Sequence, residues 1–436
     1  MKTHSKNPWG FIPTLYLAEG FPYIIINTVS VLLYADLGLP NDQITLWTGW
    51  LYLPWVLKMF WSPVVDSRST KRKWLLGAQT VLAAVLLGIA AVLLFQAFIY
   101  AGKAGLQTTF TLTLFGFLLG AFASATLDIA TDGYYLLALT AQQQSRFVGI
   151  RTIFYRLAMI LGSGALISAT GFLADKGFVP KPYNWVCLFG FWGILFLAFA
   201  AFHFYILPVP PEDKPADIPQ TTAWREAFSS YFTQPNILYI LLFILIYRFG
   251  EALLEKIVPL FLLKPVSEGA LELSITQFGW IKGTFGLGGI IAGNLLGGWL
   301  LGKYGFKKCI WPFACSLVLP NFFYVYLVNV RPGIPTIALL VTLENFGYGL
   351  AMMALTVFIM YVSQGKYKTS HYAISTGIMA LGMMVPSMLS GKMQVWLGYE
   401  GFFCATALIS LLSFAVVPLC FEIKTLEETE KRFRQK

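Results

Sequence analysis

Charged side chains are scarce in this chain. Asp, Glu, Lys and Arg make up 12% of its 436 residues, whereas 57% are hydrophobic and the mean hydropathy is +0.67. A water-soluble domain of this length does not bury so large a share of apolar side chains, because polar ones must cover its surface. The scarcity of charge therefore predicts a multi-pass protein of the lipid bilayer.

Patterns that mark enzymes and metal sites are missing as well. No HExxH or GxSxG motif occurs, and no His or Cys is placed against a candidate base. The five cysteines lie in or at the ends of apolar runs without paired spacing, and the three histidines are scattered. We therefore expect no enzyme, no disulfide framework, no metal site and no other cofactor.

Positive charge predominates, with 31 Lys and Arg against 21 Asp and Glu and a net charge of +10. Such a balance can indicate a nucleic-acid partner, but most of the basic residues fall in loops and ends on one side of the predicted spans. This asymmetry is the positive-inside pattern of membrane proteins. It predicts that both termini are cytoplasmic and that the chain binds no nucleic acid.

Apolar runs of about 20 residues or more, long enough to cross a bilayer, recur roughly twelve times. The first follows Lys2 and Lys6 as a signal peptide would, but Glu19 interrupts it, so we expect an uncleaved span that is broken at residues 20–22. The predicted spans are residues 9–34, 44–61, 74–100, 108–137, 147–174, 183–207, 234–263, 274–301, 309–330, 335–362, 371–397 and 401–421.

Five prolines between residues 208 and 219 interrupt this series and predict a stiff, extended cytoplasmic linker. The fold class expected is an all-α membrane protein with twelve transmembrane helices in two six-helix bundles. The expected parts are an N-terminal bundle (1–207), the linker (208–232), a C-terminal bundle (233–421) and a cytoplasmic tail (422–436).

Two acidic residues, Asp128 and Asp132, are four apart and share one face of a predicted span. If the next span returns antiparallel, Arg156 lies at the depth of Asp128 and Arg151 at that of Asp132. A charge at mid-membrane costs at least ~2.5–3.5 kcal/mol, so these groups should pair and face a cavity. The alternatives are a structural clamp between two helices and a charge network of a transporter, in which Asp128, Asp132 and Glu19 are candidates for proton coupling.

A second set of polar residues lies in the C-terminal half. Arg248, Glu251 and Glu255 are spaced to form one face of a helix, where the first two either belong to a charge network or only neutralise each other. Arg248 and Lys282 are the candidates for binding an anionic solute. The remaining candidates are acceptors and an aromatic ring suited to sugars or to a helix contact: Glu344, Asn345 and Tyr348.

Glycines recur at regular spacing in the predicted eighth span. Gly289, Gly293 and Gly297 are four residues apart, which suits either a moving interface between bundles or static close packing.

A loop sequence occurs in both halves of the chain. The loop S-P-V-V-D-S-R-S-T-K-R-K has a counterpart, G-G-W-L-L-G-K-Y-G-F-K-K, at residues 297–308. Both resemble the loop between helices 2 and 3 of the major facilitator superfamily. This resemblance implies two parallel six-helix halves, with a gating role for Asp66, Arg72 and Lys73.

The likeness narrows to one branch of that superfamily. L-K-M-F-W-S-P-V-V-D, S-A-T-L-D-I-A-T-D, I-Y-R-F-G-E-A and L-E-N-F-G-Y-G look like the corresponding segments of AmpG-type muropeptide permeases, in order along essentially the whole chain. The resemblance implies a proton-coupled importer of N-acetylglucosaminyl-anhydro-N-acetylmuramyl peptides in the bacterial inner membrane. A permease for another amphiphilic anion, such as a siderophore or an acyl-CoA-like compound, is the alternative. The expected partners are the solute, protons and the bilayer, and the expected state is a monomer.

Overall fold

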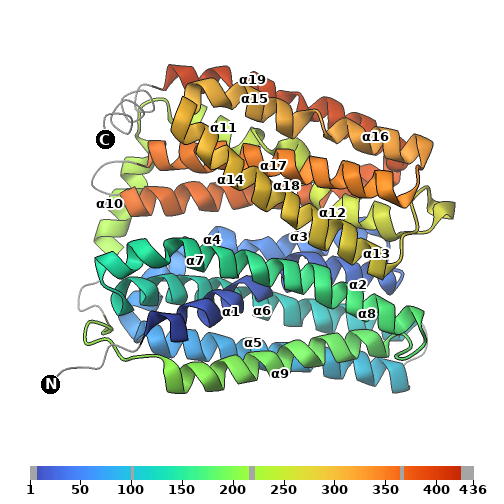
Figure 1. Ribbon diagram of the computed structural model, residues 1–436, viewed down its shortest axis with the longest axis horizontal. Coiled ribbons are helices and arrows are strands. Elements are labelled where there is room, and N and C mark those ends of the chain that lie inside the picture. Colours follow the sequence, from blue (N-terminus) through green and yellow to red (C-terminus); the bar gives the residue numbers. More distant parts are fainter. Residues whose placement is uncertain (1–6, 100–102, 216–220, 364–367, 424–436) are drawn as a thin grey trace. The chain divides into compact units, whose positions relative to one another are not determined.

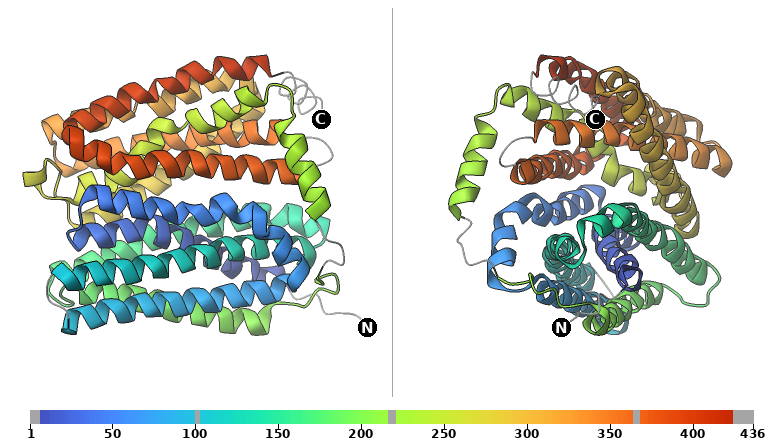
Figure 2. Two further views of the ribbon diagram at one scale, coloured as in Figure 1. Left: turned by 180° about the vertical axis from the view of Figure 1, so that it is seen from behind. Right: turned by 60° about the vertical axis from the view of Figure 1, so that its left-hand side comes forward.

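The computed structural model describes residues 7–99, 103–215, 221–363 and 368–423, and all secondary structure in these ranges is helical (Figures 1 and 2). The chain forms two compact units. We call Met1–Leu37 with Phe60–Pro219 the N-terminal unit, and Gly38–Met59 with Gln220–Lys436 the C-terminal unit. Each is described by itself.

The N-terminal unit is built from long apolar helices. Within it, α1 packs on α6 and α7, and α5 packs on α6 and α9. Its helices are α1 (Ile12–Ile24), α2 (Ser30–Asp36), the end of α4 (Leu53–Arg68), α5 (Lys71–Ile99), α6 (Lys103–Ala138), α7 (Ala141–Ile160), α8 (Leu166–Asp175) and α9 (Tyr183–Ile206).

The C-terminal unit is also built from packed helices, most of which follow the predicted linker in the chain. Within it, α14 packs on α17, α15 on α17, and α12 on α18. Its helices are α3 (Asn41–Gly49), the start of α4, α10 (Thr221–Phe232), α11 (Ile237–Ile246), α12 (Phe249–Leu263), α13 (Ile275–Phe278), α14 (Leu287–Tyr304), α15 (Phe306–Val318), α16 (Asn321–Val330), α17 (Ile334–Val362), α18 (Lys368–Ser410) and α19 (Leu412–Val416).

Ten helices in the described ranges are long and apolar enough to cross a membrane. One of them, Ser370–Glu422, is 53 residues long and contains a sharp turn at Gly398, whose φ of 68° ends one helix and begins the next. It therefore holds the last two predicted spans. The predicted second span lies in the helical stretch α3–α4, where several Trp residues and Lys58 lower the hydropathy.

The predicted break in the first span is wrong. Helix α1 continues through Pro22 to Ile24, and a π-helical turn (Ile25–Val29) then leads into α2. Further π-helical turns occupy Leu161–Ala165 and Gly279–Gly286. Insertions of this kind widen a helix without interrupting it, and they are frequent at functional sites.

The segment between the two units is only partly the extended linker that its prolines predict. Its second part forms α10, which belongs to the C-terminal unit and packs on α18. There the Tyr231 and Ser375 hydroxyls lie 2.8 Å apart, and Ser230 lies 2.9 Å from Nε2 of His371. The predicted tail lies largely outside the described residues, which end at Ile423.

The stretch Gly38–Met59 is held on α18 by close contacts. Asn41 donates hydrogen bonds to the side chains of Gln394 (2.9 Å) and Tyr399 (2.8 Å), and the backbone N–H of Gly391 donates to the Thr45 hydroxyl (3.1 Å). A Cβ atom on Gly391 would lie 2.1 Å from that hydroxyl oxygen, so only glycine allows the two helices to approach this closely. The contact explains why this stretch belongs to the C-terminal unit.

Candidate functional site

The N-terminal unit gathers intramembrane charges where α1, α6 and α7 meet. The predicted ion pair between Arg151 and Asp132 is present, with 3.1 Å between Nη1 and Oδ1. Tyr16 of α1 joins the pair, since its hydroxyl donates to Asp132 (3.0 Å) and accepts from Arg151 (3.2 Å). The guanidinium also lies 5.2 Å from the ring centres of Tyr16 and Tyr135. We call Tyr16, Glu19, Asp128, Asp132 and Arg151 the N-cluster.

Glu19 is the most deeply buried acid of the N-cluster. Its side chain is near those of Asp128, Asp132 and Arg151, and the residue is only 7% exposed. The next residue explains this position, because a Cβ on Gly20 would lie 2.6 Å from the carbonyl oxygen of Tyr155. Glycine thus lets α1 touch the backbone of α7 and brings Glu19 among the charges of α6 and α7.

The second predicted pair, Asp128 with Arg156, stays a prediction. Nη1 of Arg156 lies 3.7 Å from the sulfur of Met159, one turn further along α7. Asp128 lies near Glu19 and near Tyr155, the residue before Arg156. The geometry therefore places the expected residues in one region.

The exposure of the Arg151–Asp132 pair favours a working charge network over a structural clamp, and a substitution tests which of the two applies. The two side chains are 31% and 47% exposed, and an ion pair so accessible contributes at most about 1 kcal/mol to stability. We therefore expect Arg151→Gln to reach wild-type levels in the membrane, with solute uptake reduced. Fluorescence-detected size exclusion measures the folded protein. Poor folding that Asp132→Asn rescues would instead show that the pair is a structural clamp.

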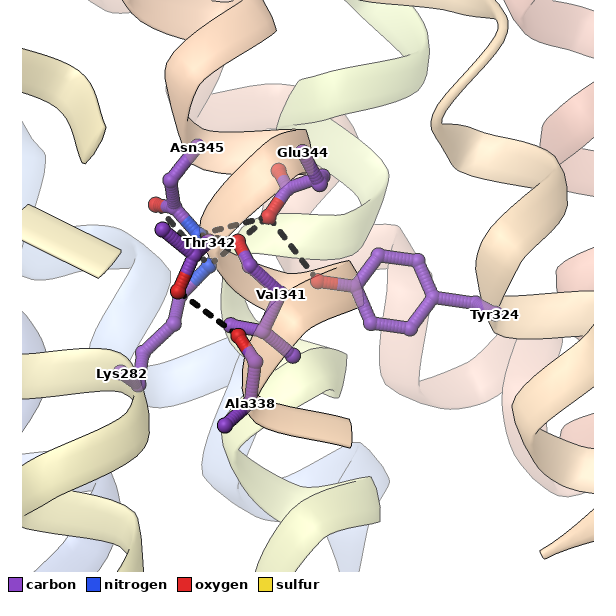
Figure 3. Close-up of polar contacts among 7 residues, drawn as sticks. All are labelled: Lys282, Tyr324, Ala338, Val341, Thr342, Glu344 and Asn345. Carbon is purple, nitrogen blue, oxygen red and sulfur yellow. Dashed lines mark hydrogen bonds and ion pairs between the residues drawn. The ribbon is translucent and has the colours of Figure 1, made fainter. Parts of the chain in front are cut away.

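The C-terminal unit contains a second group of charges, centred on Glu344 of α17 (Figure 3). Oε2 of this carboxylate accepts from Lys282 Nζ (3.4 Å), the Tyr324 hydroxyl (3.0 Å) and the Asn345 amide (2.7 Å). The Lys282 ammonium also donates to Oδ1 of Asn345 (3.4 Å). Lys282 and Glu344 side chains are 22% and 3% exposed. The four residues form the C-cluster.

This arrangement corrects one expectation about Lys282. We expected its charge to be available to an anionic solute, together with that of Arg248. The structure instead pairs Lys282 with a buried carboxylate, which compensates its charge. Glu251 of α12 lies near the same groups, with Glu344, Lys282, Arg248 and Glu255 around it.

Arg248 lies where the predicted seventh span is interrupted. Helix α11 ends at Ile246, and α12 begins after Arg248, whose φ of −113° and ψ of 18° are not helical. The Ser413 hydroxyl donates to the carbonyl oxygen of Tyr247 (2.8 Å), which stabilises the interruption. The Arg248 guanidinium donates to the Tyr348 hydroxyl and lies 4.9 Å from the centre of its ring. Sequence reasoning missed this break, because no proline marks it.

Glu255 and Lys256 contact Tyr52 of the short 3₁₀ turn Trp50–Tyr52. The Tyr52 hydroxyl donates to Oε1 of Glu255, and the buried ammonium of Lys256 lies 5.0 Å from the centre of the Tyr52 ring. Tyrosines thus accompany the charges at Asp132, Glu344, Arg248 and Glu255. The sequence did not single out Tyr16, Tyr52 and Tyr324, because aromatic residues are 16% of the chain and their partners depend on packing.

The predicted gating loop is described in part. The side chain of Asp66 lies outside the described residues, and Lys73 is exposed. The Arg72 guanidinium donates to the carbonyl oxygen of Phe204 (2.5 Å). Asp213, in the predicted linker, accepts from the backbone N–H groups of Lys71 (2.6 Å) and Arg72 (3.0 Å) and so caps α5. A gating role for the loop stays a prediction.

Solved structures of known transporters superimpose on this chain along most of its length. The D-xylose-proton symporter superimposes with a TM-score of 0.71, covers 97% of this chain and 98% of its own, and is 14% identical. A mutant form of the nucleoside transporter NupG gives the same TM-score at 15% identity, covering 94% of this chain and 98% of its own. At these identities the likeness shows the fold alone.

Curated relatives match most of the chain in sequence. "Putative transporter AmpG 4" of Rickettsia conorii is 24% identical over 412 residues, which cover 91% of this chain and 92% of the relative. "Anhydromuropeptide permease" of Escherichia coli K12 is 24% identical over 380 residues, which cover 86% of this chain and 72% of the relative.

The Major Facilitator Superfamily model matches residues 14–265 and 257–436, nearly the whole chain. The all-helical fold and the intramembrane charges in both units agree with this match. The chain belongs to the Major Facilitator Superfamily, and it is a multi-pass membrane transporter rather than an enzyme.

Proposed function

We propose that this transporter imports muropeptides, N-acetylglucosaminyl-anhydro-N-acetylmuramic acid and its peptides, across the bacterial inner membrane by proton symport. The observation that carries the proposal is the similarity, over most of the chain, to proteins named AmpG and anhydromuropeptide permease. Both termini are then cytoplasmic, as the distribution of Lys and Arg predicts.

The solute is large, amphiphilic and anionic, so it needs a cation for its carboxylates and aromatic faces for its sugar rings. Arg248 and Tyr348 supply such a pair, one above the other. Arg248 also stands at the N-cap of α12, in a helix that is interrupted within its span. The N-terminus of a half-helix favours negative charge, as in other transporters with discontinuous helices. Glu344, Asn345 and Tyr348 remain our candidates for the sugar hydroxyls and rings.

Uptake into proteoliposomes tests the substrate. Radiolabelled anhydromuropeptide should accumulate when the outside is made acidic, and the response should vanish when a protonophore is added. Ferric siderophore and acetyl-CoA are the competing solutes of similar size and charge. Uptake of either one without uptake of the muropeptide would show that the proposed substrate is wrong. Uptake that does not respond to the pH gradient would exclude proton symport.

Arg248 gives the sharpest test of solute recognition. Arg248→Gln should raise the apparent KM for an anionic muropeptide by about 10- to 100-fold, since a hydrogen bond to a charged group contributes roughly 1.5–3 kcal/mol. The kcat should change much less if the contact acts in binding. Arg225→Gln, an exposed arginine of α10, is the matched control. An unchanged KM would exclude Arg248 from the binding site.

A further inference from the structure

Acidic side chains come close together in the N-cluster. Glu19 lies near Asp128 and Asp132, and Arg151 is paired with Asp132. Carboxylates that share a site disfavour one another's ionised forms, and an isolated buried charge is so unfavourable that the group normally binds a proton instead. We therefore expect a proton to be bound among these acids.

The geometry indicates which acid is ionised. Oδ1 of Asp132 accepts from both Arg151 and Tyr16, contacts that stabilise a carboxylate. Glu19 forms no ion pair in the described parts of the chain. Its Oε2 is buried and has no hydrogen-bond partner there. Asp132 is thus held as the anion, whereas Glu19 is not.

The contact between Glu19 and Asp128 requires a proton. Their side chains lie within hydrogen-bonding reach of each other. Two carboxylates have only acceptors to offer, so a hydrogen bond between them exists only when one is protonated. Asp132 and Arg151 are also near Glu19, as are the phenol groups of Tyr16 in α1 and Tyr155 in α7.

We propose that Glu19 and Asp128 share the transported proton and that Glu19 is its carrier. The inference rests on the proposed proton symport and names the site where the proton is held. On release, the O–H bond of the carboxyl group breaks, its electron pair stays on the oxygen as a carboxylate, and water takes the proton as hydronium. Arg151 lies near Glu19 as well as Asp132, so the new Glu19 carboxylate competes with Asp132 for the guanidinium. Rearrangement of this ion pair links the loss of the proton to a movement of α1 against α7.

Glu19→Gln tests the proposal, because glutamine keeps the shape of the protonated acid and cannot release a proton. In wild-type proteoliposomes a pH difference of one unit supports about a tenfold solute accumulation for each coupled proton, 1.4 kcal/mol. In Glu19→Gln the accumulation ratio should fall to about one. Exchange of internal for external muropeptide without a gradient should continue, because it needs no net proton movement. Glu400→Gln, at an exposed acid, is the control and should accumulate solute normally.

A second measurement needs no solute. Infrared difference spectra of the purified protein between acidic and alkaline buffer should contain the C=O stretch of a protonated carboxylic acid. This band should disappear in Glu19→Gln and persist in Asp132→Asn. A band that persists in Glu19→Gln, or full gradient-driven accumulation by this variant, would overturn the proposal.

The infrared result separates the two proposals. Suppose that the wild type transports no muropeptide and that the carboxylic acid band is absent from Glu19→Gln. This result would refute the proposed substrate and would support the proposed proton site. If Glu19→Gln does not fold, labelling of the wild type by dicyclohexylcarbodiimide decides, since this reagent modifies protonated carboxyl groups in apolar surroundings. Modification of Glu19, located by mass spectrometry, supports the proposal, and an unmodified Glu19 excludes it.

Discussion

Lys282→Gln is expected to reduce the amount of folded protein sharply, and Glu344→Gln in the same chain should restore it. The reason is the burial of Glu344, whose carboxylate loses its only cationic hydrogen-bond partner in the described structure and keeps the neutral donors Tyr324 and Asn345. Removing one member of a buried ion pair costs about 3–5 kcal/mol, whereas replacing both by neutral groups is often tolerated.

Thermal denaturation of the detergent-solubilised protein measures this effect, together with its level in the membrane. Lys303→Gln is a suitable control, because this exposed lysine lies on α14, the helix that follows the turn containing Lys282. The double variant should fold and yet transport poorly if the pair also contacts the solute. A single Lys282→Gln variant that melts with the wild type would show that Glu344 is not ionised in the resting protein.

The ion pairs of the N-cluster and the C-cluster differ in how much of their side chains is exposed. Arg151 and Asp132 have a shorter ion pair, 3.1 Å against 3.4 Å, yet their side chains are far more accessible. Distance alone would rank the N-cluster pair as the stronger contributor to stability. Exposure is expected to reverse this order where the side chains face water, because a charge that loses its partner is then still hydrated. The two pairs are therefore expected to respond differently to the same kind of substitution.

The sequence predicted the pair in the N-terminal unit because it lies in a hairpin. Helix α6 ends at Ala138 and α7 begins at Ala141, so the depth of each charge follows from counting residues away from a short turn. The capping box of Thr140 and Gln143 marks that turn in the sequence. Local order along the chain was enough to place Asp132 opposite Arg151.

The pair of Lys282 and Glu344 could not be found in this way. The two residues are 62 positions apart, on helices that are not neighbours in the chain. Counting residues gives the depth of each charge but not which helices touch. That information lies in the packing of α14 against α17, which the glycine spacing indicated without naming the partner helix. The interruption at Arg248 was likewise hidden, since a hydroxyl group from a distant serine stabilises it.

Gly293→Ala is expected to destabilise the protein, whereas Gly288→Ala should be neutral or slightly stabilising. A Cβ on Gly293 would lie 2.2 Å from the carbonyl oxygen of Phe346 in α17, while one on Gly288 would meet nothing within 4 Å. Alanine favours a helix over glycine by up to ~1 kcal/mol at either position. At Gly293 the backbone clash outweighs this gain, and overpacking costs roughly 1–3 kcal/mol or more.

The comparison of these two alanine variants also decides what the glycine stripe does. Gly289, Gly293 and Gly297 all face α17 of the same unit, so the structure favours static packing within that unit over a sliding surface. Forcing α14 away from α17 would also strain the contact of Lys282 with Glu344. Lys282 lies in the turn that leads into α14, and Glu344 lies in α17. Melting temperatures of the two variants measure the difference. If Gly293→Ala melted with the wild type and slowed transport alone, α14 and α17 would have to separate during the transport cycle.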